Sequence, residues 1–533
     1  MQFRYIFLSL FINKSGWFSY IKESAYRFNR CVGTNLAYPS RDLSRKPLLA
    51  ETRNNIGFYK REKLKKSKWI LISIFIFVCW LPVLVINYPG IIISDYTWQY
   101  FQALGQSEMT NHHPVIHTMI IRFSQWLSGV VCGQISAETA VLINSILQMI
   151  ILSGIIGYVL KQIAEQAVMC SRYVKRILII SGLWYVLFPM NSLFSIYMTK
   201  DIIFSACCFL WSFLLYRDIK EYDGNIKKDN DGRIKSIIAE SVIAVLIICF
   251  RSNGFIIVVG TLILAIIYKR KLKKLHIILG IALTAWIIQI PILNAAKIPQ
   301  TELVEALGIP INQVANVVNH NESLTEQEKT LIENVMSLDT IKETYNVRYS
   351  DPLKFNSKFN GSVIEENKVE YLKLWVGLFV KYPKDYLEAS LNLTIGYWYP
   401  GVDKGCISYN YDTRTQFFDQ LGIEHYSVNT LYKHFLTADV RQNIFESAFW
   451  SPGLAVMFLL ILLLLCVGQE FYNLIFMFLP AILGWVSLLI AAPSYCETRY
   501  VYFVFLILPV IIVCMLIEKE QNYGQDCSFD TML

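Results

Sequence analysis

One stretch of the chain, residues 87–127, gathers several side-chain types that can carry chemistry. A single carboxylate, Asp95, follows an apolar run, and aromatic residues, a His-His-Pro turn at 112–114 and an amphipathic run come after it. A carboxylate can abstract a proton from a hydroxyl group as a general base, or bind a divalent cation through its oxygen atoms. The alternative role for Asp95 is the N-cap of a helix that begins at Tyr96, because Asp is a preferred cap residue. The two roles are compatible, since a capping carboxylate can still face a cavity.

Composition and hydropathy define the surroundings of this stretch. Of the 533 residues only 17% are charged, whereas a soluble domain has roughly 25%. Several windows of about 18–20 nearly uncharged apolar residues predict a polytopic membrane protein. The net charge of +8 comes from short basic clusters beside apolar segments, which is the positive-inside pattern and argues against nucleic acid as a partner. The cysteines are scattered without CxxC or Cys/His metal spacing, so we expect packing residues rather than a disulfide framework.

The basic clusters also set the expected topology. Clusters at 60–68 and 269–274 are predicted to be cytoplasmic, so the first apolar helix runs outwards and residues 87–127 face the outside. The segment 113–131 is expected to lie along the outer surface or to re-enter, because a crossing there would place the basic loop at 161–176 outside. The charged segment 217–235 is expected to be a solvated cytoplasmic loop. The predicted fold is an all-α polytopic membrane protein with about ten transmembrane helices, at 69–88, 137–161, 177–189, 201–216, 236–250, 255–268, 276–294, 449–467, 471–491 and 500–517.

Residues 295–447 interrupt this pattern, because they are polar and mixed in charge. They are far longer than a linker and predict a mixed, mainly helical external region. Within it, the amphipathic and aromatic segment 371–400 predicts a pair of helices on the membrane face. No internal repeat is evident, so an inverted-repeat transporter is not supported. The predicted divisions are a cytoplasmic N-terminal segment at 1–68, a transmembrane module at 69–294 with its first external loop at 89–136, the external region, C-terminal transmembrane helices at 448–517 and a cytoplasmic tail at 518–533.

Several ionisable residues lie at helix ends or in short loops that this topology places outside. Such groups are costly near the hydrocarbon edge unless they are paired or functional, so they can converge on one outward-opening cavity. The alternative is that each ends a helix and extends its charge to water. The candidates are Asp95, Glu108, His112, His113, Lys200, Asp201, Arg251, Glu497 and Arg499.

Chemical roles follow from the residue types. Arg251 and Arg499 suit a phosphate group because guanidinium makes bidentate contacts, and Asn253 lies in the turn after Arg251. Lys200 and Asp201 begin a helix, where the Asp suits the helix dipole and the ammonium stays available. His112 and His113 are expected to hydrogen-bond to a phosphate or an acceptor rather than to bind zinc, because adjacent His side chains seldom face one ion. We expect Asp95 to lie within one sugar-phosphate length of both arginines.

The order of these motifs resembles the GT-C superfamily of polytopic glycosyltransferases, which includes protein mannosyltransferases and lipid A aminoarabinose transferases. The resemblance rests on an outward-running first helix, Asp95 in the first external loop, and the sequence HPVIH at 113–117 before an amphipathic run. That run is similar to a juxtamembrane segment of these enzymes that contains Pro-Pro-Leu. The pairs and turns at 200–201, 251–254 and 497–500 resemble patterns of an uncharacterised bacterial branch, and the resemblance covers most of residues 69–517.

The resemblance implies an inverting transfer of a sugar from a polyprenyl-phosphate-linked donor to a glycan, lipid or protein acceptor on the outer face. It implies Asp95 as the base or as a metal-site residue, so a divalent cation is the one cofactor to consider. The chain departs from the family in two respects. Asp95 stands without a second acidic residue beside it, with Glu108 or Asp201 as candidate partners, and Val115 replaces the second Pro of the juxtamembrane motif. In this interpretation Arg251, Arg499 and Lys200 hold the donor phosphate, supported by His112, His113, Asp201, Glu108, Glu497 and Asn253.

A transporter or flippase of lipid-linked glycans is the alternative function, because it would need the same basic outer cavity. Transporters carry polar or broken helices at the membrane midplane. The central thirds of most predicted helices are uniformly apolar here. The sequence therefore favours the transferase.

Overall fold

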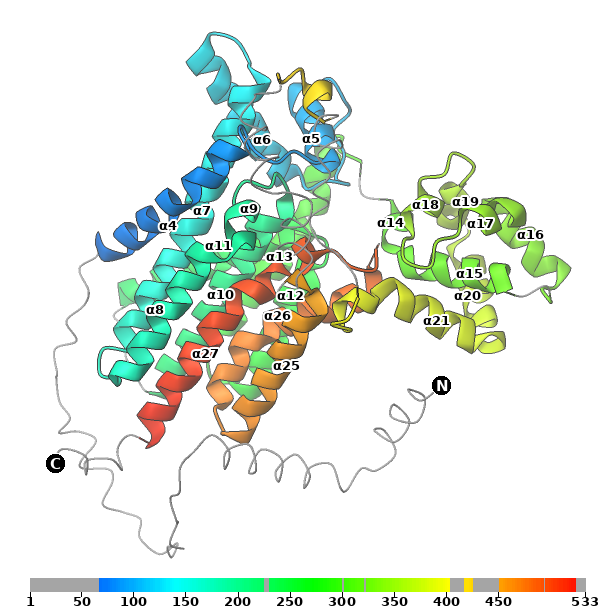
Figure 1. The fold of residues 1–533 in the computed structure, drawn as a ribbon. Coiled ribbons are helices and arrows are strands. Elements are labelled where there is room, and N and C mark those ends of the chain that lie inside the picture. The colour runs from blue at the N-terminus through cyan, green and yellow to red at the C-terminus, as the bar shows by residue number, and fades with distance from the viewer. Residues whose placement is uncertain are drawn as a thin grey trace, which may run out of the picture.

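The computed structural model describes residues 67–224, 230–299, 302–320, 323–402, 417–424, 450–492 and 494–523. Over these residues the chain is helical, with isolated bridges and no strand. Figure 1 shows a bundle of long helices, and a smaller helical unit that projects from one end of it. The predicted N-terminal segment, apart from its last two residues, and most of the predicted tail lie outside the described residues.

In the described residues, ten helices make up the long bundle, and short elements join them at one end. The bundle helices are α4 (Ser67–Ile86), α7 (Ala137–Gln166), α8 (Arg172–Leu187), α10 (Lys200–Asp223), α11 (Asn230–Phe250), α12 (Gly254–Tyr268), α13 (Lys273–Ala295), α25 (Pro452–Gly468), α26 (Tyr472–Ala491) and α27 (Tyr502–Tyr523). The short elements are α5 (Ser94–Leu104), α6 (Val115–Cys132), α9 (Pro189–Phe194) and η3 (Thr498–Val501).

Seven helical segments of the described chain are long and apolar enough to cross a membrane, so the chain is a multi-pass membrane protein. α12 and α25 are shorter apolar helices, while α8 and α11 do not meet these limits of length and composition. The seven include α6, which the sequence predicted to lie along the outer surface or to re-enter. The segments are Lys68–Ile86, Val115–Cys132, Ala137–Gln166, Lys200–Asp223, Lys273–Ala295, Tyr472–Ala491 and Thr498–Asn522.

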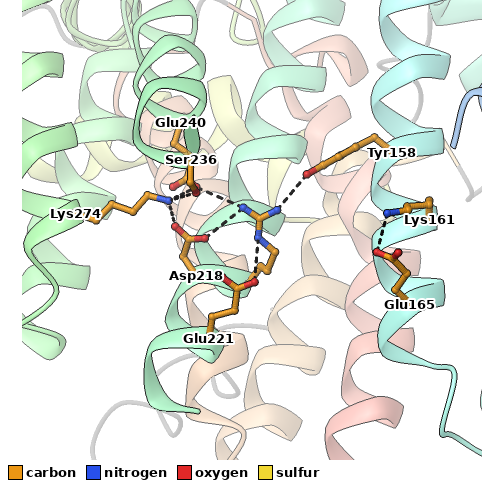
Figure 2. Close-up of polar contacts among 9 residues, drawn as sticks. Tyr158, Lys161, Glu165, Asp218, Glu221, Ser236, Glu240 and Lys274 are labelled. Carbon is orange, nitrogen blue, oxygen red and sulfur yellow. Dashed lines mark hydrogen bonds and ion pairs between the residues drawn. The ribbon is translucent and has the colours of Figure 1, made fainter. Parts of the chain in front are cut away.

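α10 is the central helix, because it is buried along nearly its whole length. The prediction of a solvated loop at 217–235 is wrong for most of that segment. Most of it is helical, because α10 continues to Asp223 and α11 already begins at Asn230. Ion pairs explain the difference. Lys274 of α13 pairs with Asp218 of α10 and with Glu240 of α11, and Figure 2 shows the three side chains converging. Buried charges that are paired in this way allow helices to continue through a charged sequence.

Charged groups therefore gather near both ends of α10. Asp201 and Asp218 lie seventeen positions apart on α10, which corresponds to a rise of about 25 Å along the helix axis. That length is close to the hydrocarbon thickness of a bilayer, about 30 Å. The Asp201 end also carries α5 and the projecting unit, because Arg499 pairs with both Asp95 of α5 and Asp201, and His112 contacts Glu305 of that unit.

The projecting unit has a hydrophobic core of its own, with Val317, Ile332 and Leu353 among its buried residues. Its last two helices, α20 and α21, correspond to the helix pair predicted within 371–400, and Pro383 begins α21 at a position where proline is favoured. The rest of the predicted external region, 403–416 and 425–447, lies outside the described residues. The elements are α14 (Leu303–Ala306), α15 (Gly308–His320), α16 (Glu326–Val335), α17 (Leu338–Thr344), α18 (Asp351–Lys354), α19 (Gly361–Glu366), α20 (Lys368–Lys381), α21 (Pro383–Thr394) and η1 (Ile395–Tyr397).

Candidate active site

The loop after α4 is held against the segment that precedes α10. The backbone N–H of Ile91 donates to the carbonyl of Ile196 at 2.9 Å, and the N–H of Met198 donates to the carbonyl of Ile91 at 2.9 Å. The Ser145 hydroxyl donates to the Pro89 carbonyl at 2.8 Å and fixes the same loop to α7. These bonds bring the start of α5 next to the start of α10, so residues about 105 positions apart in sequence share one site.

Asp95 lies in the first turn of α5, where a negative charge is favourable to the helix dipole. The predicted capping role is wrong, because α5 begins at Ser94 and its N-cap residue is Ile93, with no side-chain cap bond. The Asp95 side chain is 29% exposed. A carboxylate that does not cap the helix and is not fully covered is available for another partner.

Arg499 is that partner, and it joins three carboxylates. Its Nη1 lies 3.6 Å from Oδ2 of Asp95, and its Nε lies 3.6 Å from Oδ2 of Asp201 and 3.4 Å from Oε2 of Glu497. These residues come from α5, α10 and the segment before α27. Arg499 is thus the residue that connects the three parts of the site.

Asp201 and Arg251 form a second pair behind Arg499. Asp201 is fully buried, its Oδ1 pairs with Nη1 of Arg251, and its Oδ2 accepts a hydrogen bond from the Thr199 hydroxyl at 3.1 Å. The Arg251 guanidinium lies over the ring of Tyr500, 4.5 Å from its centroid, which is a cation–π arrangement. Asp95, Arg499, Asp201 and Arg251 are therefore linked in one chain of ion pairs. Their roles stay predictions.

Lys200 and His113 flank this chain of ion pairs. Lys200 Nζ lies 3.4 Å from Nδ1 of His113, and the His113 side chain is buried. Burial, together with the charge of Lys200, lowers the pKa of His113 to about 3, so the ring is neutral at physiological pH. Within the described part of the chain Lys200 has no carboxylate at ion-pair distance. It is the cation of the site that is best placed to receive an anion.

The charges of the site are balanced rather than basic. Three carboxylates, Asp95, Asp201 and Glu497, face the three cations Lys200, Arg251 and Arg499. Burial opposes the charge on Asp95, but Arg499 and Lys200 hold the pKa of that carboxyl below its usual range. Burial raises the pKa of Glu497. Asp95 therefore stays ionised more readily than Glu497, although its pairing with Arg499 makes it a weak base while that pair is intact.

Three predicted site residues lie outside this network. The Glu108 side chain is exposed, and in the described structure it takes part in no ion pair of the site. His112 is 42% exposed and contacts Glu305 of the projecting unit at 4.0 Å. Asn253 donates from Nδ2 to the Ser487 hydroxyl at 2.9 Å and so ties α12 to α26. Asn253 and His112 thus join neighbouring elements, and Glu108 is not a partner of Asp95.

The sequence interpretation assigned no role to a buried polar pair beside the site. Nδ1 of His117 lies 2.8 Å from Oε1 of Gln99, whose Nε2 donates to the Thr118 hydroxyl at 2.9 Å. Nε2 of His117 is buried and has no hydrogen-bond partner among the described residues. The sequence signal that could have found it is His117 itself, a second ring in the first turn of α6, four residues after His113 of the turn that precedes the helix.

Metal ligands are not preassembled at Asp95. Among the described residues, the group that meets the spacing of a metal site is His320, Asp385 and Glu388, in the projecting unit and partly exposed. At Asp95 the nearby charged group is instead the Arg499 guanidinium. A divalent cation would have to displace that arginine from the carboxylate.

An apolar groove adjoins the site between α6, α11 and α13. Its volume is about 760 Å³, and its lining includes Val115, Cys249 and Ile288. Cys249 precedes Arg251 by two residues, and Val115 follows the His-His-Pro turn, so one end of the groove lies at the level of the charged residues. The groove is large enough for the hydrocarbon part of a ligand, since ligand pockets measure about 300–1,000 Å³.

The fold and the site together define a multi-pass α-helical membrane protein with a buried, charge-balanced site at one end of its bundle. The chain belongs to a family described as a family of unknown function (DUF6020), whose model matches residues 97–527. The matched part includes Lys200, Asp201, Arg251, Glu497 and Arg499, and it begins two residues after Asp95. Searches of curated proteins and of solved structures found no match.

Proposed function

We propose that this protein is an integral-membrane glycosyltransferase similar to the GT-C superfamily, which moves a hexosyl or pentosyl group from a polyprenyl-phosphate donor to a glycan, lipid or protein acceptor. The observation that carries the proposal is the link from a partly exposed carboxylate, Asp95, through Arg499 to the buried pair of Asp201 and Arg251. The residues that would act as the base and as phosphate-binding cations are thus joined by ion pairs. The apolar groove beside them suits the lipid part of such a donor.

The proposed topology has about ten crossings, the site on the outer face of the cell membrane and both termini in the cytoplasm. The alternating directions of the ten bundle helices support it, because the start of α10, the end of α11 and the start of α27 meet at the site. α6 then lies in the interface or re-enters. Its exposed residues Phe123 and Trp126 flank the exposed Arg122, a mixture typical of the interface.

In the proposed reaction Asp95 accepts the proton of an acceptor hydroxyl as the hydroxyl oxygen attacks the anomeric carbon. The bond between that carbon and the phosphate oxygen breaks, and polyprenyl phosphate leaves with the bonding electron pair. Lys200 and Arg499 stabilise the phosphate charge that develops. Because the phosphate competes with Asp95 for Arg499, donor binding weakens the ion pair that depresses the basicity of Asp95.

A transporter or flippase of lipid-linked glycans is the second candidate. It is favoured by the charged groups at both ends of α10 and by a cavity of about 720 Å³ at the other end, lined by Arg217 and Glu240. Between its two ends, α10 carries mainly buried apolar side chains, such as Phe204, Phe209 and Leu214. A polar path along α10 would need these side chains to be replaced or moved, which favours the transferase.

The test is a transfer assay with the purified full-length protein in liposomes. A panel of polyprenyl-phosphate hexoses and pentoses is supplied as donors, membrane extract serves as the acceptor source, and released polyprenyl phosphate is measured. Asp95→Asn is expected to lower the rate by about 10²-fold or more, because it removes a general base without changing the size of the side chain. Glu108→Gln, in the same loop, is the matched control and keeps the wild-type rate. Equal rates for Asp95→Asn and wild type would contradict the proposal.

A further inference from the structure

The projecting unit contains an apolar cavity that the proposed function does not use. Its volume is about 440 Å³, and Ile311, Val314, Ile332 and Trp375 are among the lining residues. The walls come mainly from α15, α16 and α20, and α14, α17, α18 and α19 contribute single residues. Cavities larger than a water molecule are few in native proteins, because interiors are close-packed. A cavity of this size has the volume of a ligand pocket.

The polar atoms that approach the cavity are already paired. Nε1 of Trp375 donates to Oε1 of Gln313 at 2.8 Å, and the hydroxyl of Tyr371 donates to the carbonyl of Leu331 at 2.9 Å. Lys368, at the start of α20, is the charged residue of the lining, and it is exposed. Apolar cavities of this kind are poor sites for water and bind apolar molecules.

α20 forms the wall through which the cavity opens. Of its fourteen residues the buried one is Leu378. Leu372 lines the cavity and is also 58% exposed, so the interior reaches the surface beside it. On the outer side of the helix Val369, Val376 and Phe379 are exposed and continue the apolar surface around Leu372.

α21 connects this apolar surface to the bundle. α21 continues the exposed stripe with Leu387 and Leu391 and leads into η1. η1 is fixed to the bundle, because Nε1 of Trp485 donates to the carbonyl of Tyr397 at 2.8 Å. In Figure 1, α21 reaches from the bundle to the projecting unit, with α20 beside it along the lower edge of that unit. Exposed Lys373 and Lys384 lie on the same two helices, an arrangement suited to lipid head groups.

We infer that the cavity of the projecting unit binds one acyl chain of a phospholipid from the leaflet at the site end of the bundle, with the chain entering beside Leu372. The acyl chain fits the apolar walls, and the head group stays with the other lipids beside α20. Binding of the chain fixes α20 and α21 against the membrane. This inference goes beyond the transferase proposal and does not depend on it.

The test uses the full-length protein in nanodiscs that contain a phosphatidylglycerol with a diazirine in its palmitoyl chain. After illumination, labelled peptides are mapped by mass spectrometry. Label is expected on the peptides that hold Val314 and Trp375, in addition to peptides of the bundle. Val314→Phe and Ile311→Phe each fill part of the cavity. Each variant is expected to reduce the label in the projecting unit by about fourfold for every methylene group of the acyl chain that it excludes from the cavity. Label on the bundle peptides serves as the internal standard.

Val347→Phe is the matched control, because Val347 is exposed in the same unit and does not line the cavity. It leaves the labelling pattern unchanged, and circular dichroism identifies any variant that does not fold. Label confined to bundle peptides would overturn the inference. Equal labelling of the projecting unit in the wild type, Val314→Phe and Ile311→Phe would also overturn the inference. A parallel experiment with a diazirine-bearing polyprenyl phosphate separates the two kinds of chain, and label from that probe alone would overturn the assignment to an acyl chain.

Discussion

Replacing Asp201 with Asn tests whether the ion pairs behind Asp95 hold the site together. Asp201 is fully buried, and it pairs with both Arg251 and Arg499, whose side chains are 16% and 15% exposed. Asn keeps the volume and removes the charge, so two guanidinium groups lose their common counterion. Breaking a buried ion pair by removing one partner costs about 3–5 kcal/mol. We expect Asp201→Asn to lower the free energy of unfolding by about that amount.

The measurement is reversible unfolding in mixed micelles, followed by tryptophan fluorescence and proteolysis. The matched control is Asp223→Asn, on the same helix. Asp223 is 32% exposed and pairs with Lys269 at 2.7 Å, and pairs in contact with solvent contribute roughly 0–1 kcal/mol. Arg251→Met, combined with Asp201→Asn, removes one of the unpaired charges and restores part of the stability. Two results would refute this account of the site. One is a loss of unfolding free energy in Asp201→Asn that is smaller than the loss in Asp223→Asn. The other is a loss in the double variant that exceeds the sum of the losses in the two single variants.

Three further predictions concern other ionisable groups. The folded-state pKa of His113, about 3, lies below the unfolded value of 6.5, so the unfolded state gains a proton as pH falls below 6.5 and stability declines by up to about 1.4 kcal/mol per pH unit. His113→Gln removes that decline between pH 6.5 and 4, and an unchanged slope in thermal unfolding at several pH values would contradict it. Lys200→Met raises KM for the polyprenyl-phosphate donor by about tenfold or more, with partial recovery in Lys200→Arg, because a hydrogen bond to a charged group is lost. Glu240→Gln, on α11 near the Asp218 end of α10, lowers the free energy of unfolding by about 2 kcal/mol and leaves kcat of the folded protein unchanged, because Lys274 keeps Asp218 as a partner.

The helices of the bundle could be predicted from the sequence, because their apolar runs are long and basic clusters lie beside them. The convergence of Asp95, Arg251 and Arg499 also followed from the predicted topology, since all three were assigned to one face. Their pairing did not follow. The residue types favoured phosphate binding by Arg251 and Arg499. The structure pairs each of these arginines with buried Asp201.

The errors have a common physical cause, which is that partners distant in sequence decide how a charged segment folds. The composition of residues 217–235 is that of a solvated loop, and nothing local indicates that Lys274 will neutralise Asp218 and let α10 continue. Asp is a preferred N-cap residue, and Asp95 was therefore a candidate cap. The backbone hydrogen bonds of Ile91 to the segment before α10 instead set where α5 begins. The cavity beneath α20 depends on the packing of several helices of the projecting unit and has no sequence motif.

The central claim is that the site carries out transfer rather than movement of a lipid-linked sugar. The most direct measurement follows one population of donor in sealed liposomes that contain the purified protein. A polyprenyl-phosphate sugar labelled in both its sugar and its phosphate reports cleavage by separation of the two labels, and its access to a membrane-impermeant oxidant reports movement across the bilayer. We predict separation of the labels in the presence of acceptor extract, lost in Asp95→Asn, with no increase in movement across the bilayer. Movement of intact donor without separation of the labels would contradict the proposal and identify a flippase.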